Sequence, residues 1–433
     1  METGYDALTY LQMNPVQGIV IHDQLELMSS VDTVKRIQSK KLGVPIWLWV
    51  TQQSVDHLHS FLEAGCDRWL LETSPPDILQ KLIRDAVQWK SRYPIVNRKR
   101  FQLTKLFGLP NLIGSSGAMM QLYYQLERTL NADITVLIQG ESGSGKELVA
   151  RLLHSLSSRS SEKFVGLNCA AIPRDLMESE LFGYEKGAFT GATIAKKGKF
   201  EYAHKGTLFL DEIADLDLTL QGKILRVLEL GEFERIGSNQ TRHTDVRILS
   251  ATNKNLERAV RKKTFRLDLF YRINSFTVEV PPLRDRYGDF LPLLVYILKR
   301  SNQKNHRNIQ SFDWGVLPLL QEYPWPGNIR QLESFLTQAA LYSDKPHLEE
   351  TTVRRLLEPL RQSGLEAVPE KPSPPTVRPG GGTMEEMERL AILQALEEVG
   401  GNVTAAAKKL GLSRVTVWRK MERYKIKFER PQS

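Results

Sequence analysis

The sequence predicts a multidomain α/β protein with a P-loop nucleotide-binding core in the middle and a small all-α domain at its C-terminal end. A buried-strand pattern runs through a glycine-rich loop into a helical pattern over residues 134–156. Strand-like and helix-like segments also alternate over the first 90 residues, and short basic helical patterns occupy residues 383–433. Changes of hydrophobic periodicity of this kind separate α/β domains from all-α domains.

Length and composition are those of a globular protein. The 433 residues are enough for about two to four domains, and 41% of them are hydrophobic. We see neither a stretch of eighteen apolar residues nor a signal peptide, so we expect a cytoplasmic protein with no membrane partner. Cys66 and Cys169 lie far apart without a CxxC partner, which favours a reducing compartment over a disulfide framework or zinc site.

Polar and Pro/Gly-rich stretches predict the domain boundaries. The segment 364–382 holds five prolines and ends in three glycines, and a shorter basic stretch surrounds residues 93–102. We therefore expect an α/β segment (1–95), a linker (96–110), a central domain (111–345), a further stretch ending in the Pro/Gly-rich linker (346–382) and a helical domain (383–433).

The motif GESGSGKE predicts a phosphate-binding loop. It follows the apolar run ITVLIQG and leads into the helical pattern KELVARLLHSL, which is the strand–loop–helix context that a P-loop needs. Its glycines let the backbone wrap a phosphate chain, and its lysine adds a cation for the β- and γ-phosphates. Glu147 stands where a serine or threonine usually binds Mg²⁺. The expected ATP-binding residues are Gly140, Glu141, Ser142, Gly143, Ser144, Gly145, Lys146 and Glu147.

A second motif, GTLFLDEIADL, supplies acidic residues at a predicted strand end. Asp211 is expected to hold Mg²⁺ through its water shell, and Glu212 to act as general base on the attacking water. The strand pattern VRILSATN ends at Asn253, which is placed to sense the γ-phosphate. Together with the P-loop, these residues make ATP hydrolysis the favoured chemistry.

Two arginines follow in FRLDLFYRI. Arg266 and Arg272 are six residues apart, nearly two helical turns, so both are able to face one neighbour. Arginines supplied across a subunit boundary stabilise transition-state charge. Taken alone, isolated arginines of this kind are more often members of structural salt bridges.

Six motifs follow one another in the sequence: GESGSGKE, GAFTGA, GTLFLDEI, FRLDLFYRI, PPLRDR and YPWPGNIRQLE. In this order they resemble the AAA+ domain of bacterial enhancer-binding proteins, the activators of sigma-54 RNA polymerase. The resemblance covers residues 111–343. It implies a AAA+ P-loop core with a helical lid, and dimers that assemble into a hexameric ring in which Arg266 and Arg272 act in trans. It also implies that Asn168 restrains the catalytic glutamate and that Arg330 is the sensor arginine of the lid.

The GAFTGA motif is the expected contact with sigma-54. The resemblance implies that this loop grips sigma-54 when ATP is bound, with Phe189 as the gripping ring. Two glycines would act as hinges, since glycine reaches backbone angles closed to other residues. The competing interpretation is that the phenylalanine folds back into the core. The residues concerned are Gly187, Ala188, Phe189, Thr190, Gly191 and Ala192.

The C-terminal residues are predicted to bind enhancer DNA. Nine Lys or Arg residues against two Glu residues give residues 401–433 a charge of +7, within a total of +9 for the chain. The helix–glycine turn–helix pattern is typical of a helix-turn-helix and resembles the dimeric Fis-like module of enhancer-binding proteins. The expected DNA-binding residues are Arg414, Thr416, Arg419, Lys420 and Arg423.

The N-terminal segment resembles the later part of a flavodoxin-like receiver domain. Asp23 takes the place of the phosphoacceptor, but the acidic metal-binding pair is missing and Glu72 replaces the expected lysine. Either Val50 or Thr51 aligns with the switch hydroxyl. We therefore expect no phosphorylation, an open sheet edge, and a docking or dimerisation surface.

The leading hypothesis is therefore an ATPase that binds enhancer DNA and remodels sigma-54 RNA polymerase to open promoters. Two alternatives stay open. One is a DNA-binding regulator that acts by occupancy with a vestigial ATPase, and the other is a AAA+ remodeller of a different protein.

Overall fold

The structure is a computed structural model that describes residues 3–16, 18–40, 46–52, 54–66, 68–71, 80, 112–114, 116–129 and 132–362, together with residues 403, 407 and 421. The chain divides into two compact units, residues 1–367 and 368–433. The five predicted DNA-binding residues and Glu72 lie outside the described residues. In the part of the chain that the structure describes, helices are too short or too polar to span a bilayer.

The central domain is built on a five-stranded parallel sheet with the strand order β12-β4-β11-β8-β5. Parallel strands covered on both faces read as continuous apolar runs, as the sequence shows here. The predicted strand at 134–140 is confirmed in its middle part. The strands are β4 (Val136–Gln139), β5 (Phe164–Asn168), β8 (Thr207–Asp211), β11 (Arg247–Thr252) and β12 (Phe276–Glu279).

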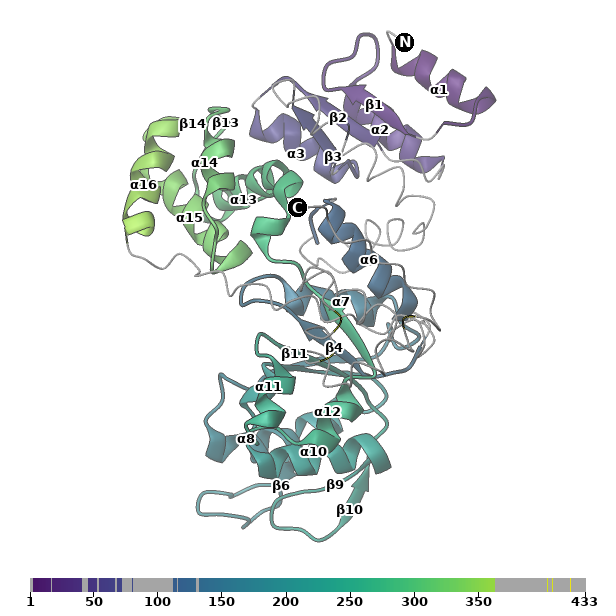
Figure 1. Cartoon of the computed structure of the whole chain (residues 1–433), viewed down its shortest axis with the longest axis vertical. Coiled ribbons are helices and arrows are strands. Elements are labelled where there is room, and N and C mark those ends of the chain that lie inside the picture. Colours follow the sequence, from purple (N-terminus) through teal and green to yellow (C-terminus); the bar gives the residue numbers. More distant parts are fainter. Residues whose placement is uncertain are drawn as a thin grey trace. The chain divides into compact units, whose positions relative to one another are not determined.

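Helices cover both faces of this sheet (Figure 1). On β4, Val136 and Ile138 join one core cluster with α6 and α7, whereas Leu137 joins the other with α8, α10 and α12. The alternation follows from the two-residue period of a strand. The helices are α6 (Gly117–Thr129), α7 (Lys146–Ser155), α8 (Arg174–Phe182), α10 (Leu218–Leu230), α11 (Leu256–Arg261) and α12 (Leu267–Ile273).

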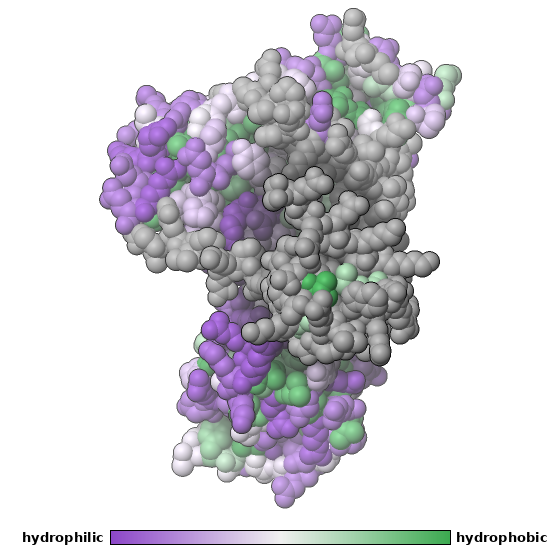
Figure 2. Space-filling model, viewed as in Figure 1, coloured by the Kyte–Doolittle hydropathy of each residue, from purple (hydrophilic) through white to green (hydrophobic). Residues whose placement is uncertain are grey.

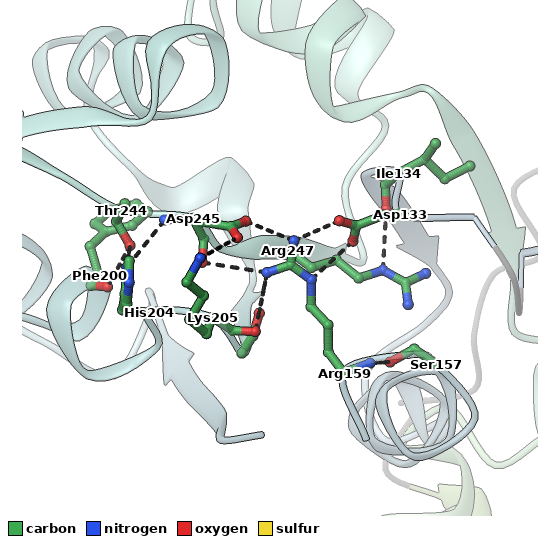
Figure 3. Close-up of polar contacts among 11 residues, drawn as sticks. Asp133, Ile134, Ser157, Arg159, Phe200, His204, Lys205, Thr244, Asp245 and Arg247 are labelled. Carbon is green, nitrogen blue, oxygen red and sulfur yellow. Dashed lines mark hydrogen bonds and ion pairs between the residues drawn. The ribbon is translucent and has the colours of Figure 1, made fainter. Parts of the chain in front are cut away.

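An ion-pair cluster ties together the amino ends of three strands (Figure 3). Arg159 Nη2 lies 2.6 Å from Asp133 Oδ2 and 2.8 Å from Asp245 Oδ1, and its Nη1 donates to the Lys205 carbonyl oxygen at 3.2 Å. These partners precede β4, β11 and β8 respectively. Because the cluster lies at the end opposite the predicted phosphate loop, we assign it to stability rather than chemistry.

The expected helical lid follows the sheet. It contains α13 (Phe290–Asn305), α14 (Val316–Glu322), α15 (Asn328–Tyr342) and α16 (Glu350–Gln362), and a short parallel bridge pairs Ser311–Phe312 with His347–Leu348. Helix α16 buries Val353 and Leu357, and its outer surface is largely hydrophilic in Figure 2.

The N-terminal segment forms a three-stranded parallel sheet in the order β1-β2-β3. Strand β1 pairs with β2 alone among the described residues, so it is an edge strand, as expected. Its elements are α1 (Gly4–Met13), β1 (Ile19–His22), α2 (Ser30–Ser39), β2 (Ile46–Val50), α3 (Val55–Glu63) and β3 (Arg68–Leu71).

Candidate ATPase site and sigma-54 loop

The glycine-rich loop joins β4 to α7 at the carboxyl edge of the central sheet. Lys146 is the first residue of α7, and its side chain is buried. Its Nζ donates to the carbonyl oxygens of Gly140 at 3.1 Å and Glu141 at 3.4 Å. The lysine ammonium is therefore held at a helix N-terminus, where backbone N–H groups and the helix dipole both favour a bound anion.

Glu212 comes from the end of β8 and meets this lysine. Its Oε1 lies 3.1 Å from Lys146 Nζ, and its Oε2 accepts the backbone N–H of Asn253 at 3.0 Å. Glu212 has a φ of 53°, a left-handed conformation that is uncommon for residues other than glycine. The carboxylate is thus fixed on both oxygens by groups from α7 and from the end of β11.

Asp211 lies beside it with a different environment. One carboxylate oxygen, Oδ2, accepts the amide of Asn168 at 3.2 Å, whereas Oδ1 is buried and has no hydrogen-bond partner among the described residues. Burial, followed by the charge of Glu212, raises the pKa of the Asp211 carboxyl group. A buried carboxylate oxygen without a donor fits a site for a hydrated cation, which would replace the missing partner.

The resemblance implied that Asn168 restrains the catalytic glutamate, whereas in this structure its side chain contacts Asp211. Its amide donates to Asp211, and its carbonyl oxygen accepts the backbone N–H groups of Ala170 at 2.9 Å and Ala171 at 3.1 Å. The partners that hold Glu212 in this structure are Lys146 and the Asn253 backbone. Asn253 contacts Glu212 through its backbone N–H, and its side chain is exposed.

Glu147 is paired along its own helix. Its carboxylate pairs with Arg151 one helical turn later, at 2.7 Å to Nη2 and 3.0 Å to Nε. This position therefore offers no hydroxyl ligand, in agreement with the departure from the usual P-loop pattern. Metal binding would depend on Asp211.

The two arginines of FRLDLFYRI lie at opposite ends of α12. Arg266 is the N-cap residue, with extended backbone angles, and Arg272 lies in the last turn of the same helix. Arg266 pairs with Asp268 at 2.7 Å, and Arg272 donates to the Leu228 carbonyl oxygen at 2.8 Å. Both side chains lie close to α10, because Leu228 belongs to that helix and a Cβ atom on its Gly222 would lie 3.4 Å from Arg266 Nη1.

The lid contacts the P-loop through the lid motif YPWPGNIRQLE. A Cβ atom on Gly143 would lie 2.2 Å from the Gly327 carbonyl oxygen and 3.1 Å from Arg330 Cβ, so only glycine permits this approach. Arg330 is therefore next to the phosphate loop, with an exposed side chain. Asn328 and Arg284, which contact Glu141, were not singled out from the sequence, although both lie in motifs that it displays.

GAFTGA forms a tight turn between Gly183–Tyr184 (β6) and Lys196–Lys197 (β7), which pair antiparallel. The N–H of Gly187 donates to the Ala192 carbonyl oxygen at 2.8 Å, and both motif glycines have positive φ angles of 85° and 104°. Phe189 is 44% exposed, and its ring packs edge-on against Tyr184 at 4.9 Å. The phenylalanine is thus outside the core and, among the residues that the structure describes, has one aromatic neighbour.

Sequence reasoning missed the hairpin that supports this turn. Strands β9 (Glu232–Glu234) and β10 (Thr241–His243) pair antiparallel, and Figure 1 shows them at the same end of the domain as β6. Arg235 links the two by pairing with Glu185 at 3.1 Å and with Glu201 at 2.7 Å. Nothing in the local periodicity reveals these pairs, because their members are up to 50 residues apart.

Asp23 of the receiver-like segment is buried and fully hydrogen-bonded. Its Oδ2 accepts the N–H groups of Thr51 at 2.8 Å and Gln52 at 2.9 Å, and its Oδ1 accepts the Thr51 hydroxyl at 2.7 Å. Of the two residues considered for the switch position, Thr51 meets Asp23, whereas Val50 lies buried in β2. The carboxylate joins the ends of β1 and β2.

Three family models match the chain. Residues 112–279 match the sigma-54 interaction domain, residues 284–368 the AAA+ ATPase lid domain, and residues 383–424 the bacterial regulatory protein, Fis family. The transcriptional regulatory protein ZraR of Klebsiella oxytoca is 37% identical over 422 residues, which is 97% of this chain and 92% of that protein. The regulatory protein AtoC of Escherichia coli K12 is 36% identical over 399 residues, or 92% and 86% of the two chains.

Solved structures of NtrX from Brucella abortus agree with this. The complex with ATP has 27% identity and a TM-score of 0.54, covering 98% of this chain and 92% of that chain. The complex with ADP has 28% identity and a TM-score of 0.53, covering 98% and 93%. The expected fold class, a AAA+ P-loop core with a helical lid and a Fis-type helix-turn-helix, is confirmed. With such similarity over nearly the whole of both chains, this protein belongs to the sigma-54-dependent transcriptional activators and carries their ATP-binding ATPase domain.

Proposed function

We propose that this activator, bound to enhancer DNA, uses ATP hydrolysis to remodel sigma-54 RNA polymerase and open the promoter. The observation that carries the proposal is the convergence of Lys146, Asp211 and Glu212 at one edge of the sheet. The ATP and ADP complexes of NtrX support the same use of the site.

Lys146 and Glu212 give the site its chemistry. The γ-phosphate of ATP would compete with Glu212 for the lysine ammonium, because it carries more negative charge. Glu212, still held by the Asn253 N–H, is then free to accept the proton of the attacking water. We propose that Asn168 and the side chain of Asn253 respond to the γ-phosphate, because β5 ends at Asn168 and β11 ends just before Asn253.

Asp211 is the residue that we propose holds magnesium. Its unpartnered Oδ1 would accept a water of the metal's hydration shell, and Asn168 orients the other oxygen. A bound Mg²⁺ ion supplies charge neutralisation for the phosphates. The serines of the loop, Ser142 and Ser144, and the backbone from Gly140 to Gly145 would wrap the phosphate chain.

The positions of two arginines support the proposal of oligomerisation. Arg266 and Arg272 flank α12, and we propose that a neighbouring subunit's ATP accepts them in a hexameric ring built from dimers. Arg266 is solvent-exposed beyond its pair with Asp268, which leaves it accessible to a second subunit. Arg330 would report the phosphate state to the lid.

We propose that the GAFTGA turn grips sigma-54 through Phe189 and Thr190. A half-exposed aromatic side chain on a glycine-flanked turn is typical of a binding anchor. The helix-turn-helix would bind enhancer DNA through Arg414, Thr416, Arg419, Lys420 and Arg423. The N-terminal segment would act as a docking or dimerisation surface without phosphorylation.

A steady-state ATPase assay of Glu212→Gln tests the proposal. We expect turnover to fall by about 10²–10⁴-fold while ATP binding persists, since Gln keeps the shape of the side chain and removes the base. Glu178→Gln, which removes a surface carboxylate paired with Lys223, is the control. If the Glu212→Gln variant has lost hydrolysis and still activates transcription as well as the wild-type protein, the alternative of action by occupancy is correct instead.

A further inference from the structure

The second residue of the phosphate loop binds the lid. The two carboxylate oxygens of Glu141 lie 2.6 Å and 2.9 Å from Arg284 Nη2 and Nη1, a bidentate ion pair. Glu141 Oε2 also accepts the side-chain amide of Asn328 at 3.0 Å. Bidentate pairing fixes the relative orientation of both groups as well as their distance.

Asn328 extends this contact along the loop backbone. Its amide also donates to the Ser142 carbonyl oxygen at 3.0 Å, and its own carbonyl oxygen accepts the Leu283 N–H at 2.8 Å. It is fully buried with a φ of 52°, a left-handed conformation that asparagine tolerates better than most residues. The next residue, Ile329, donates its N–H to the Gly143 carbonyl oxygen at 3.1 Å.

These contacts place the start of α15 directly on the loop that wraps the phosphates. Arg330 follows Asn328 by two residues, so its backbone position depends on the same contacts. The hydrogen bonds from Arg284 and, to a lesser extent, from Asn328 also lower the pKa of the Glu141 carboxyl group, so this group is charged at neutral pH. The carboxylate of Glu141 contacts neither Asp211 nor Glu212 in the described contacts, so it acts on the lid rather than on the reacting groups.

We propose that Glu141 is a positioning residue that latches the lid to the phosphate loop through Arg284 and Asn328, and thereby holds Arg330 at the bound nucleotide. The inference rests on ATP binding at this loop and on the proposed role of Arg330. It makes ATP affinity sensitive to a carboxylate that need not touch the nucleotide.

The test compares Glu141→Gln and Arg284→Gln, which remove the ion pair from either side, in the full-length protein. We expect each variant to raise the KM for ATP by about fivefold and to change kcat by less than about twofold, because the pair is partly solvent-exposed. Glu333→Gln is the matched control, since it breaks an ion pair of similar exposure between lid helices α13 and α15. It should leave KM unchanged.

A double-mutant cycle with Arg330→Ala separates positioning from stability. If Glu141 acts through Arg330, Glu141→Gln should have no further effect on KM in the Arg330→Ala background. The positioning role of Glu141 would be overturned if Glu141→Gln raised KM in the Arg330→Ala background as much as it does in the wild-type protein. It would also be overturned if Glu141→Gln lowered kcat and thermal stability without changing KM. An unchanged KM in Arg330→Ala alone would overturn it too, whereas failure of the wild-type protein to hydrolyse ATP would instead reject the proposed function.

Discussion

Replacing Phe189 by alanine is the sharpest test of the proposed contact between the GAFTGA turn and sigma-54. The phenylalanine lies on a turn between two glycines, where a Cβ atom on either glycine would meet nothing within 4 Å. Its only aromatic contact in the described part of the chain is the edge of Tyr184, with an angle of 62° between the rings. The substitution therefore removes an exposed ring and one ring contact.

The cost to folding is small. Full burial of a phenylalanine contributes about 1.5–3 kcal/mol, and Phe189 is 44% exposed, so about half of this is lost. The ring pair adds about 0.5–1.5 kcal/mol. The total of about 1–3 kcal/mol is smaller than a typical stability of about 5–15 kcal/mol, so the variant should stay folded. Since Phe189 is not among the contacts of Lys146 or Glu212, ATPase turnover should stay within about twofold of wild type.

The loss in activation should be much larger. An aromatic anchor at the centre of an interface contributes about 2–4 kcal/mol, which corresponds to about thirtyfold or more in binding. The assay is transcription in vitro from a sigma-54 promoter, measured beside ATP turnover and the melting temperature. Ile194→Ala is the control, because it removes a 71% exposed apolar side chain just outside the motif. The reasoning is refuted if Phe189→Ala activates transcription normally, or if the Ile194→Ala variant loses as much activity.

Two further predictions concern the parts of the chain outside the ATPase site. Asp23→Ala leaves the partly buried N–H groups of Thr51 and Gln52 without an acceptor and should lower the unfolding free energy by about 2–4 kcal/mol, whereas Asp23→Asn keeps one acceptor and should lose about half as much. Urea unfolding measures this, and a phosphodonor with Mg²⁺ should add no mass to the wild-type protein; an added phosphoryl group that Asp23→Asn abolishes would contradict a purely structural role. At the far edge of the sheet, the hydrogen bond from Arg159 lowers the pKa of the Asp245 carboxyl group below its usual 3.8. A carboxyl group whose pKa is lowered by folding stabilises the fold at pH values above its pKa in the unfolded state. This stabilisation is lost as the pH falls through its pKa in the folded state. Arg159→Gln should therefore cost about 1 kcal/mol at pH 7, and less as the pH falls below 3.8, in denaturation experiments; a difference that does not change with pH would contradict this.

Much of the ATPase domain could be predicted from the sequence because its signals are local. A strand, a glycine-rich loop and a helix follow one another within about twenty residues, and Asp211 and Glu212 are adjacent at a strand end. Such patterns follow from periodicity and backbone geometry, which depend on near neighbours. The location of Glu212 at the same sheet edge as the phosphate loop was predictable for the same reason, since the carboxyl ends of parallel strands meet at one edge.

Contacts between distant residues were decided by packing. The sequence alone did not distinguish Val50 from Thr51 as the neighbour of Asp23, because one step along a strand reverses the side-chain direction. The sequence alone also did not reveal that Arg235 pairs with Glu185 and Glu201. Nor did it reveal that Glu141 pairs with Arg284, which is 143 residues away from it. Charged residues are common along the chain, and only the folded backbone selects which of them meet.

The sequence by itself determined the domain order, the phosphate loop, the acidic strand end and the GAFTGA turn, because each is written in consecutive residues with a fixed backbone requirement. Only the tertiary structure decided that Glu212 is held by Lys146 rather than by Asn168, and that the lid is fixed to Glu141. Those choices depend on distances between elements, which arise when the sheet and the lid pack together.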